Sequence, residues 1–175
     1  MNRDTPICKE FTEGESKKLL FVRERILEVW VLSENVMKIE RNGELNQKVV
    51  AVDIVNVMNG TFIVVIDENC QWFVMDCRLE TVRSGNIKKA SSVKQNFVCT
   101  CSWNEGNCSL FVCSVLREHL SCFTIFWNKK KTGLKVKVEN LKISNELHWN
   151  TVNSCVKAIT VMKGNDSFDF AVGDM

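Results

Sequence analysis

Hydrophobic residues occur along this chain in short runs that alternate with polar positions. The runs are rich in Val, Ile, Phe, Trp and Thr and repeat every two residues, which is typical of half-buried β-strands. Weakly helical patterns occur only near residues 115–119 and 144–149, and both are too short to connect parallel strands. The pattern therefore predicts an all-β, antiparallel meander. The predicted strands are residues 18–23, 26–32, 36–40, 49–57, 61–67, 71–77, 97–103, 109–116, 121–128, 134–138, 156–162 and 168–172.

Turn signals separate these runs and indicate an internal repeat. Gly60, Gly106 and Gly164 each stand in an Asn- and Gly-containing turn, and they recur at intervals of 46 and 58 residues. The order of strand, turn and strand around them is also repeated, and a propeller blade has a period of about 40–50 residues. We therefore divide the chain into units. These are a flexible N-terminal segment at 1–16 and a domain at 17–175, with blade-like units at 17–48, 49–96, 97–154 and a truncated 155–175.

One family resemblance is carried by the last unit and by a tripeptide in the third. The segment VKAITVMKGNDSFDFAVGDM at residues 156–175 resembles the strand–turn–strand of a WD-repeat-like β-propeller, and Phe126-Trp127-Asn128 stands where such repeats carry Trp-Asp. The resemblance implies antiparallel four-stranded blades of an incomplete, about three-blade β-propeller. A weaker likeness, based on the unit order and the Lys-rich loop after Trp127, is to the non-catalytic propeller subunit of tRNA guanine-N7 methyltransferase. A closed β-barrel or sandwich is the alternative fold.

The C-terminal unit supplies the first candidate interaction site. Propellers close their ring with about four to eight blades, so three units and a truncated fourth lead us to expect a fragment or truncated isoform of a longer chain. In that case the final strand leaves an apolar edge that can pair with another chain. The candidate edge residues are Phe168, Phe170 and Val172.

Charge restricts nucleic-acid binding to a local patch. The 175 residues carry 23 Lys and Arg against 21 Asp and Glu, a net charge of +2, which excludes a generally polybasic protein. One basic concentration exists, and it would either be a solvated hairpin or contact phosphates of RNA. Its residues are Lys129, Lys130, Lys131, Lys135 and Lys137.

The remaining candidate chemistry favours structural roles. The nine cysteines include no Cys-x-x-Cys pair of the kind that holds structural zinc, and His119 with Cys122 lacks an orienting third group, so we expect no metal, no cofactor and no catalytic residue. The N-terminus has no apolar secretory region, which predicts an intracellular protein, cytoplasmic or nuclear, with buried thiols. Carboxylates such as Asp67 and Asp76 fall in turns, where Asp hydrogen-bonds its own backbone.

These observations predict a non-catalytic scaffold that binds protein partners, or the missing remainder of a longer chain. No small-molecule substrate and no membrane contact are expected. The alternative is an RNA-associated accessory subunit, in tRNA modification or ribosome assembly, that uses the basic patch.

Overall fold

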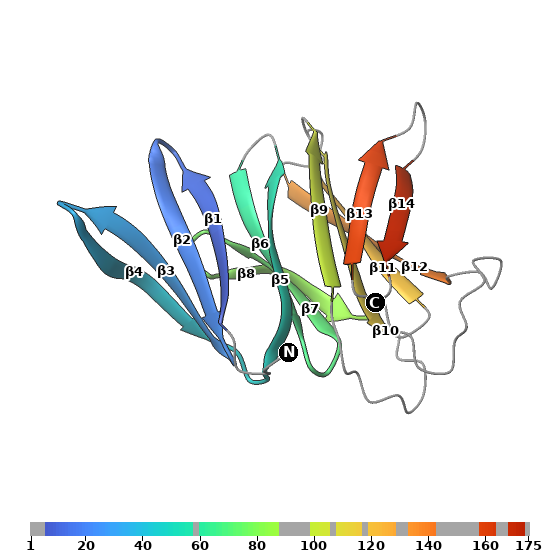
Figure 1. Ribbon diagram of the computed structural model, residues 1–175, viewed down its shortest axis with the longest axis horizontal. Coiled ribbons are helices and arrows are strands. Elements are labelled where there is room, and N and C mark those ends of the chain that lie inside the picture. Colours follow the sequence, from blue (N-terminus) through green and yellow to red (C-terminus); the bar gives the residue numbers. More distant parts are fainter. Residues whose placement is uncertain are drawn as a thin grey trace.

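The computed structural model describes residues 6–57 and 60–87 and the strands 99–105, 108–116, 119–128, 133–142, 158–163 and 168–173. Every element in these ranges is a β-strand, and the strands form four separate antiparallel sheets (Figure 1). Within this described part there is no helix with the length and apolarity needed to cross a membrane. The described strands neither merge into one closed barrel nor pair as a two-sheet sandwich, so that alternative is wrong.

Each sheet is a meander in which strands adjacent in sequence are also adjacent in space. The first sheet consists of β1 (Ile7–Glu13), β2 (Ser16–Arg23), β3 (Ile26–Ser33) and β4 (Val36–Glu44). The second consists of β5 (Val49–Val57), β6 (Gly60–Asp67), β7 (Gln71–Asp76) and β8 (Thr81–Asn86). The third consists of β9 (Cys99–Glu105), β10 (Cys108–Leu116), β11 (His119–Asn128) and β12 (Gly133–Lys142). A two-stranded sheet follows, with β13 (Ala158–Lys163) and β14 (Phe168–Gly173).

The first strands of successive sheets are neighbours. β1 contacts β5, β5 contacts β9, and β9 contacts β13, so the four sheets follow one another like blades around a common side (Figure 1). This arrangement requires each sheet to pack face to face on the next, and both faces of a central sheet must then be apolar.

The second sheet meets that requirement. On one face, Ile63 and Val65 pack with Leu20 and Val29 of the first sheet in a continuous buried cluster. On the other face, Val64 and neighbouring side chains pack against apolar residues of β12 in a second cluster. The side chains alternate between the two clusters along β6 because successive residues of a strand point to opposite faces. The β12 contributors to the second cluster are Leu134, Val136 and Val138.

Two hairpin turns in the second sheet share one design, and it confirms the predicted role of their aspartates. Asp67 Oδ1 accepts backbone N–H bonds from Asn69 at 2.9 Å and Gln71 at 2.8 Å. Asp76 Oδ1 does the same for the residues two and four positions further on, at 2.8 and 3.0 Å. In each turn the residue three positions after the aspartate is left-handed, Cys70 with φ 60° and Leu79 with φ 66°. These carboxylates are therefore engaged in turn formation.

Two strands lie outside the predicted set. Residues 1–16 were expected to be flexible, whereas residues 7–13 form β1, which pairs with β2 along its whole length and buries Phe11. Charged residues alternate with the apolar ones in β1, and this weakened its signal in the sequence. β8 was missed because Arg83, Ser84 and Gly85 give it a polar pattern, although it pairs with β7.

Candidate interaction surfaces

The face of the first sheet that points away from the second sheet is the most apolar exposed surface among the described side chains. Leu20, Val22, Leu27 and Val29 point into the cluster with the second sheet, so the residues that alternate with them point the other way. We call this the outer face. Its large apolar residues are Leu19, Phe21, Trp30, Leu32, Met37 and Ile39.

Strand register brings the outer-face residues together. Leu19 lies opposite Trp30, and Trp30 lies opposite Ile39, so one apolar row crosses β2, β3 and β4. In the next row Leu32 lies opposite Met37. Cross-strand neighbours on one face are about 4.5–5.5 Å apart at Cβ, close enough for side-chain contact. The outer face is thus one continuous patch rather than scattered apolar residues.

This patch is accessible to solvent at its outer end. Leu32 is 62% exposed, Ile39 47% and Met37 38%, and the neighbouring Val36 at the tip of the hairpin is 53% exposed. These four are the exposed large apolar residues among the described side chains, and all come from β3 and β4. Contiguous exposed apolar patches mark surfaces that bind a protein, a membrane or a ligand, whereas isolated exposed apolar residues do not.

An aromatic pair forms the centre of the outer face. The rings of Phe21 and Trp30 are 5.8 Å apart at their centroids and meet edge to face at 69°. Trp30 Nε1 donates a hydrogen bond to Glu28 Oε2 at 3.1 Å, so the polar atom of the indole is satisfied while its ring stays available. Aromatic residues with this combination are enriched at protein interfaces.

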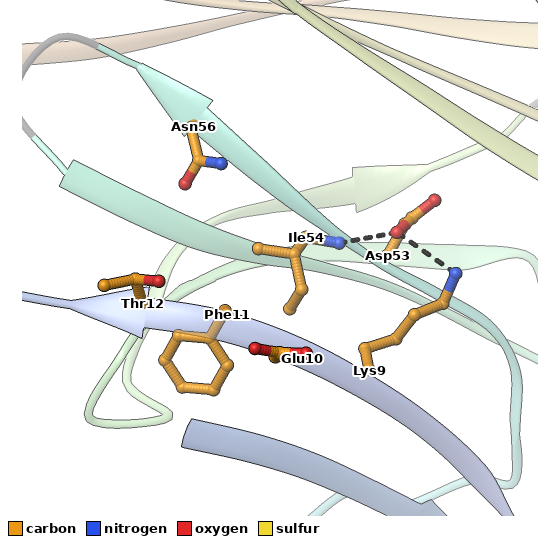
Figure 2. Close-up of a pocket in the computed structure, with 7 residues that line it drawn as sticks. All are labelled: Lys9, Glu10, Phe11, Thr12, Asp53, Ile54 and Asn56. Atoms are coloured by element: carbon orange, nitrogen blue, oxygen red, sulfur yellow. Dashed lines mark hydrogen bonds and ion pairs between the residues drawn. The ribbon is translucent and has the colours of Figure 1, made fainter. Parts of the chain in front are cut away.

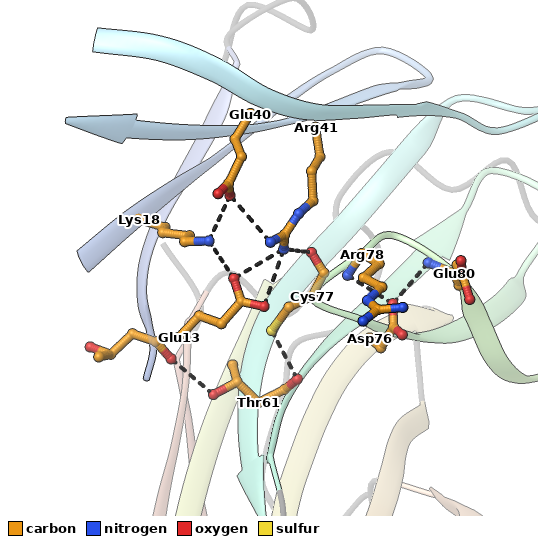
Figure 3. Close-up of polar contacts among 10 residues, drawn as sticks. Glu13, Lys18, Glu40, Arg41, Thr61, Asp76, Cys77, Arg78 and Glu80 are labelled. Carbon is orange, nitrogen blue, oxygen red and sulfur yellow. Dashed lines mark hydrogen bonds and ion pairs between the residues drawn. The ribbon is translucent and has the colours of Figure 1, made fainter. Parts of the chain in front are cut away.

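A polar network lies on the opposite, inner face and links the first sheet to the second (Figure 3). Lys18 Nζ contacts Glu13 and also donates to Glu40 Oε2 at 2.6 Å. Arg41 Nη1 donates to Glu13 Oε2 at 3.0 Å and to the backbone carbonyl of Cys77 in the second sheet at 2.5 Å. Each charge has an opposite partner, as a nearly buried lysine requires.

A β-bulge in β4 brings both an acceptor, Glu40, and a donor, Arg41, into this network. Val29 pairs with Arg41 while Trp30 pairs with Ile39, which leaves Glu40 as an extra residue without a direct partner in the pairing. Such a bulge re-aims side chains locally. As a result, Glu40 and Arg41, although consecutive, both reach Lys18 or Glu13.

The network shifts the ionisation of its members. Burial opposes ionisation of Glu13, but hydrogen bonds from Lys18 and Arg41 outweigh it and hold the pKa of Glu13 below its usual value. Burial likewise disfavours charged Lys18, yet its bonds to Glu13 and Glu40 raise its pKa. Burial and the nearby Glu13 carboxylate raise the pKa of the Cys77 thiol to about 11. Both partners of the main pair therefore stay charged at neutral pH, and Cys77 stays protonated.

A hollow of about 600 Å³ lies beside the first strands β1 and β5 (Figure 2). Lys9 Nζ lies 3.2 Å from Asp53 Oδ1 across it, and the same oxygen accepts the Ile54 backbone N–H at 2.9 Å. Asp53 is thus already neutralised by a lysine and anchored to the backbone. The lining set contains no histidine or cysteine, and the Lys9–Asp53 pair acts as a link between the first and second sheets. The lining residues are Lys9, Glu10, Phe11, Thr12, Asp53, Ile54 and Asn56.

The predicted basic patch is only partly placed. Lys135 and Lys137 are exposed and alternate on β12 with Leu134 and Val136, which pack on the second sheet. They therefore share the face of β12 that points away from the second sheet. Lys129, Lys130 and Lys131 lie outside the described residues, so the patch as a whole stays a prediction.

The predicted apolar edge lies on β14. Phe168, Phe170 and Val172 occupy alternate positions of this strand, which pairs with β13 through its whole length. Alternate positions share one face of the strand. Their role in binding remains a prediction.

The described cysteines and acidic residues offer no obvious metal centre. Cys70 and Cys77 are buried and Cys8 is exposed, and all three are free thiols. No group of three or more potential metal ligands is clustered within the part of the chain that the structure describes.

Comparisons with known proteins identify the architecture but not a family. No protein-family model matches the chain, and no curated protein sequence matches it significantly. The likenesses to WD repeats and to the tRNA guanine-N7 methyltransferase subunit therefore gain no support from sequence comparison. Among solved structures, 131 chains match, so the architecture is a common one.

One of these solved structures is BBS1N in complex with ARL6DN, soaked with lead. It matches with a TM-score of 0.60 at 11% sequence identity. The match covers 99% of this chain and 52% of that chain, so this chain spans about half the length of the protein it resembles. That neighbour is a β-propeller, and the predicted fold class is confirmed: the chain has the four-stranded antiparallel blades of an incomplete β-propeller.

Proposed function

We propose that this chain is a non-catalytic scaffold domain that binds protein partners, and that the outer face of the first sheet is its main docking surface. The observation that carries the proposal is the continuous apolar patch through Trp30, Leu32 and Ile39. Its residues are of the types that normally pack against another sheet, yet part of the patch is exposed to solvent. The solved neighbour BBS1N is found in complex with another protein, ARL6DN, and this supports a role in protein binding.

The polar features of the described region favour this role over chemistry. Glu13 and Lys18 neutralise each other, and Lys9 neutralises Asp53. The raised pKa of Cys77 keeps that thiol protonated and poorly nucleophilic at neutral pH. We place the protein inside the cell, in the cytoplasm or nucleus, where free thiols such as the exposed Cys8 persist.

Photo-crosslinking in cells tests the proposal. A photoreactive amino acid replaces Leu32 on the outer face, and a matched variant carries it at Thr81, an exposed position of β8. We expect discrete protein adducts from position 32 and few from position 81. Equal labelling from both positions, or none from position 32, would contradict the proposal.

The same experiment separates the RNA alternative. A third variant carries the photoreactive group at Lys135, within the predicted basic patch. Nuclease-sensitive adducts from this position, with none of protein at position 32, would favour an RNA-associated subunit. Salt dependence provides a second distinction, because contacts to phosphates weaken steeply as salt rises and apolar docking does not.

A further inference from the structure

Each four-stranded sheet ends in an outer strand that pairs on one side only within the described part of the chain. These outer strands are β4, β8 and β12, the last members of the three strand orders. The free side of such a strand is a template for a further strand, and proteins normally protect it with polar or charged residues. The three edges can therefore be compared for how well each is protected.

The edges of the second and third sheets are protected. β8 is only six residues long, carries the exposed Arg83 and has no large exposed apolar side chain. On β12, Val136 packs toward the second sheet, whereas Lys135 and Lys137 are exposed. Both edges thus direct polar or charged side chains to solvent, as edges that do not accept another strand usually do.

The edge of the first sheet has a different composition. β4 is nine residues long, and its Val36, Met37 and Ile39 are 53%, 38% and 47% exposed. On the same sheet Leu19 and Trp30, which lie further from this edge, are only partly exposed. The uncovered apolar surface therefore lies beside the free edge rather than over the middle of the sheet. The β3–β4 hairpin also projects away from the other sheets at one end of the molecule (Figure 1).

The hairpin turn determines which backbone groups of β4 are free. Glu34 and Asn35 form a two-residue loop with φ of 52° and 64°, so the turn is of type I′. In such a turn the flanking residues, here Ser33 and Val36, form a hydrogen-bonded pair. Hydrogen-bonded and non-hydrogen-bonded pairs then alternate along the antiparallel ladder. The N–H and C=O of the next residue, Met37, therefore point away from β3.

The same alternation directs the N–H and C=O of Ile39 to the free side, so two residues of this edge can pair with a further strand. The bulge at Glu40 follows directly, and a bulge interrupts regular pairing. The available edge is therefore Val36–Ile39, about 13 Å of strand. It admits one short extended segment.

The charge on this edge selects the added strand. Lys38 lies between Met37 and Ile39 and points to the opposite face. Its side chain is exposed and forms no ion pair or hydrogen bond with another described residue. A carboxylate beside it on the added strand would complete an opposite-charge pair, which stabilises strand pairing. A second copy of β4 is disfavoured in this place, because it would bring another Lys38 close to the first.

Resting on the proposed function, we infer that β4 binds an extended segment of a protein partner as a fifth strand of the first sheet. The backbone of the segment pairs with Met37 and Ile39. Its apolar side chains, at alternate positions, pack beside these two residues on the outer face, and an acidic side chain between them faces Lys38. In strand additions of this kind main-chain hydrogen bonds provide affinity and the alternating side chains provide specificity.

The first test is a titration of the isotopically labelled chain with a short synthetic peptide of alternating valine and glutamate, followed by NMR of the backbone amides. We expect the amides of Met37 and Ile39 to shift and to become protected from hydrogen exchange. A matched peptide with lysine in place of each glutamate should bind at least about threefold more weakly, because its charge repels Lys38. Shifts confined to Leu19 and Phe21, or no shift at millimolar peptide, would overturn the added strand.

The second test repeats the photo-crosslinking from position 32 in two variants of the edge. Met37→Pro removes an outward N–H, at a position where proline breaks no hydrogen bond within the sheet. Met37→Ala is the matched control, because it removes the side chain and keeps the N–H. We expect Met37→Pro to reduce the protein adducts at least about tenfold and Met37→Ala to retain most of them. Urea unfolding verifies that both variants are folded.

The outcomes separate this inference from the proposed function. Equal adducts, or an equal loss of adducts, in the proline and alanine variants would overturn the added strand. The proposed function would then stand if the chain without these substitutions still gives protein adducts from position 32, because a partner would lie on the outer face without pairing with its edge. Absence of adducts from that unsubstituted chain would overturn both.

Discussion

The first and second sheets are built from similar strands but have different surroundings. In the second sheet both faces are covered, and Ile63, Val64, Val65 and Ile66 are all fully buried at consecutive positions of β6. In the first sheet β3 has the same run of consecutive apolar residues, but Leu32 is 62% exposed. The difference shows that apolar residues on both faces of a strand indicate two packing surfaces, even when only one of them is occupied.

The largest expected effect compares one substitution at two positions. Ile63→Ala removes a side chain that is 0% exposed and should lower the free energy of unfolding by about 2–5 kcal/mol. Ile39→Ala, at 47% exposure on the outer face, should cost less than about 1 kcal/mol in the monomer. Urea denaturation of dilute protein measures both. Equal losses would show that the outer face is already packed.

A second comparison uses one glycine from each sheet. A Cβ at Gly85 would lie 2.7 Å from Trp72 Cζ2, so Gly85→Ala must displace a packed indole and should cost about 1–3 kcal/mol. A Cβ at Gly43 would lie 3.4 Å from the nearest atom of Leu79, an acceptable contact, so Gly43→Ala should change stability by less than about 1 kcal/mol. Thermal unfolding ranks the two variants. The reverse order would contradict the tighter packing of the second sheet.

The polar network between the sheets predicts a smaller, pH-dependent effect. The folded-state pKa of Glu13 lies below its usual value of 4.5, so its contribution to stability is complete above about pH 4.5 and is lost as pH falls through the folded-state pKa. Lys18 behaves oppositely, because its raised pKa means that its contribution is lost only as pH rises above 10.5. The contribution of the pair should therefore be constant between these limits.

Glu13→Gln provides the control for this pH dependence. The variant should have a lower free energy of unfolding than the native chain at pH 7. Its free energy of unfolding should also fall less than that of the native chain as the pH is lowered, as measured by urea unfolding from pH 3 to pH 7. If stability falls equally with acid in the variant and the native chain, Glu13 ionises equally in the folded and unfolded states.

The smallest effect is a difference in thiol reactivity that leaves the fold intact. Cys8 is exposed on the outer face, opposite Phe21, and should react readily with iodoacetamide at pH 7.5. Cys77 should react far more slowly, because it is buried and its pKa is raised to about 11. Peptide mapping of alkylated protein by mass spectrometry measures each site. Comparable rates would indicate that the junction between the sheets opens readily.

Much of the fold could be predicted from alternation alone. Strands such as β5 and β6 have long apolar runs bounded by turn residues, and their predicted ranges, 49–57 and 61–67, agree closely with the observed strands. β1 could not be recognised, because charged residues alternate with its apolar ones and because Phe11 becomes a core residue only in the cluster that also contains Ile63 and Val65 of the second sheet, which are distant in sequence. Local pattern cannot reveal packing of that kind.

The exposed apolar outer face could not be predicted in the same way. Trp30 and Leu32 are large apolar residues of the kind that fills protein cores, so their types alone do not identify an exposed surface. Sequence can indicate that Leu19-Leu20-Phe21-Val22 is apolar on both faces, but only the arrangement of sheets shows which face has a cover. The aspartates were predictable, because the hydrogen bonds of Asp67 and Asp76 lie within their own turns.

The bulge at Glu40 means that β4 does not keep one alternation along its length. Met37 and Ile39 point outward, yet Arg41, two positions later, points inward with Gly43 toward Leu79. The extra residue at the bulge thus separates the part of β4 that presents apolar residues outward, at Met37 and Ile39, from the part that presents Arg41 inward. Chain length at this point matters as much as side-chain identity: deletion of Glu40 would restore strict alternation and keep Arg41 opposite Val29 on the inner face, but it would remove the carboxylate that now accepts a hydrogen bond from Lys18.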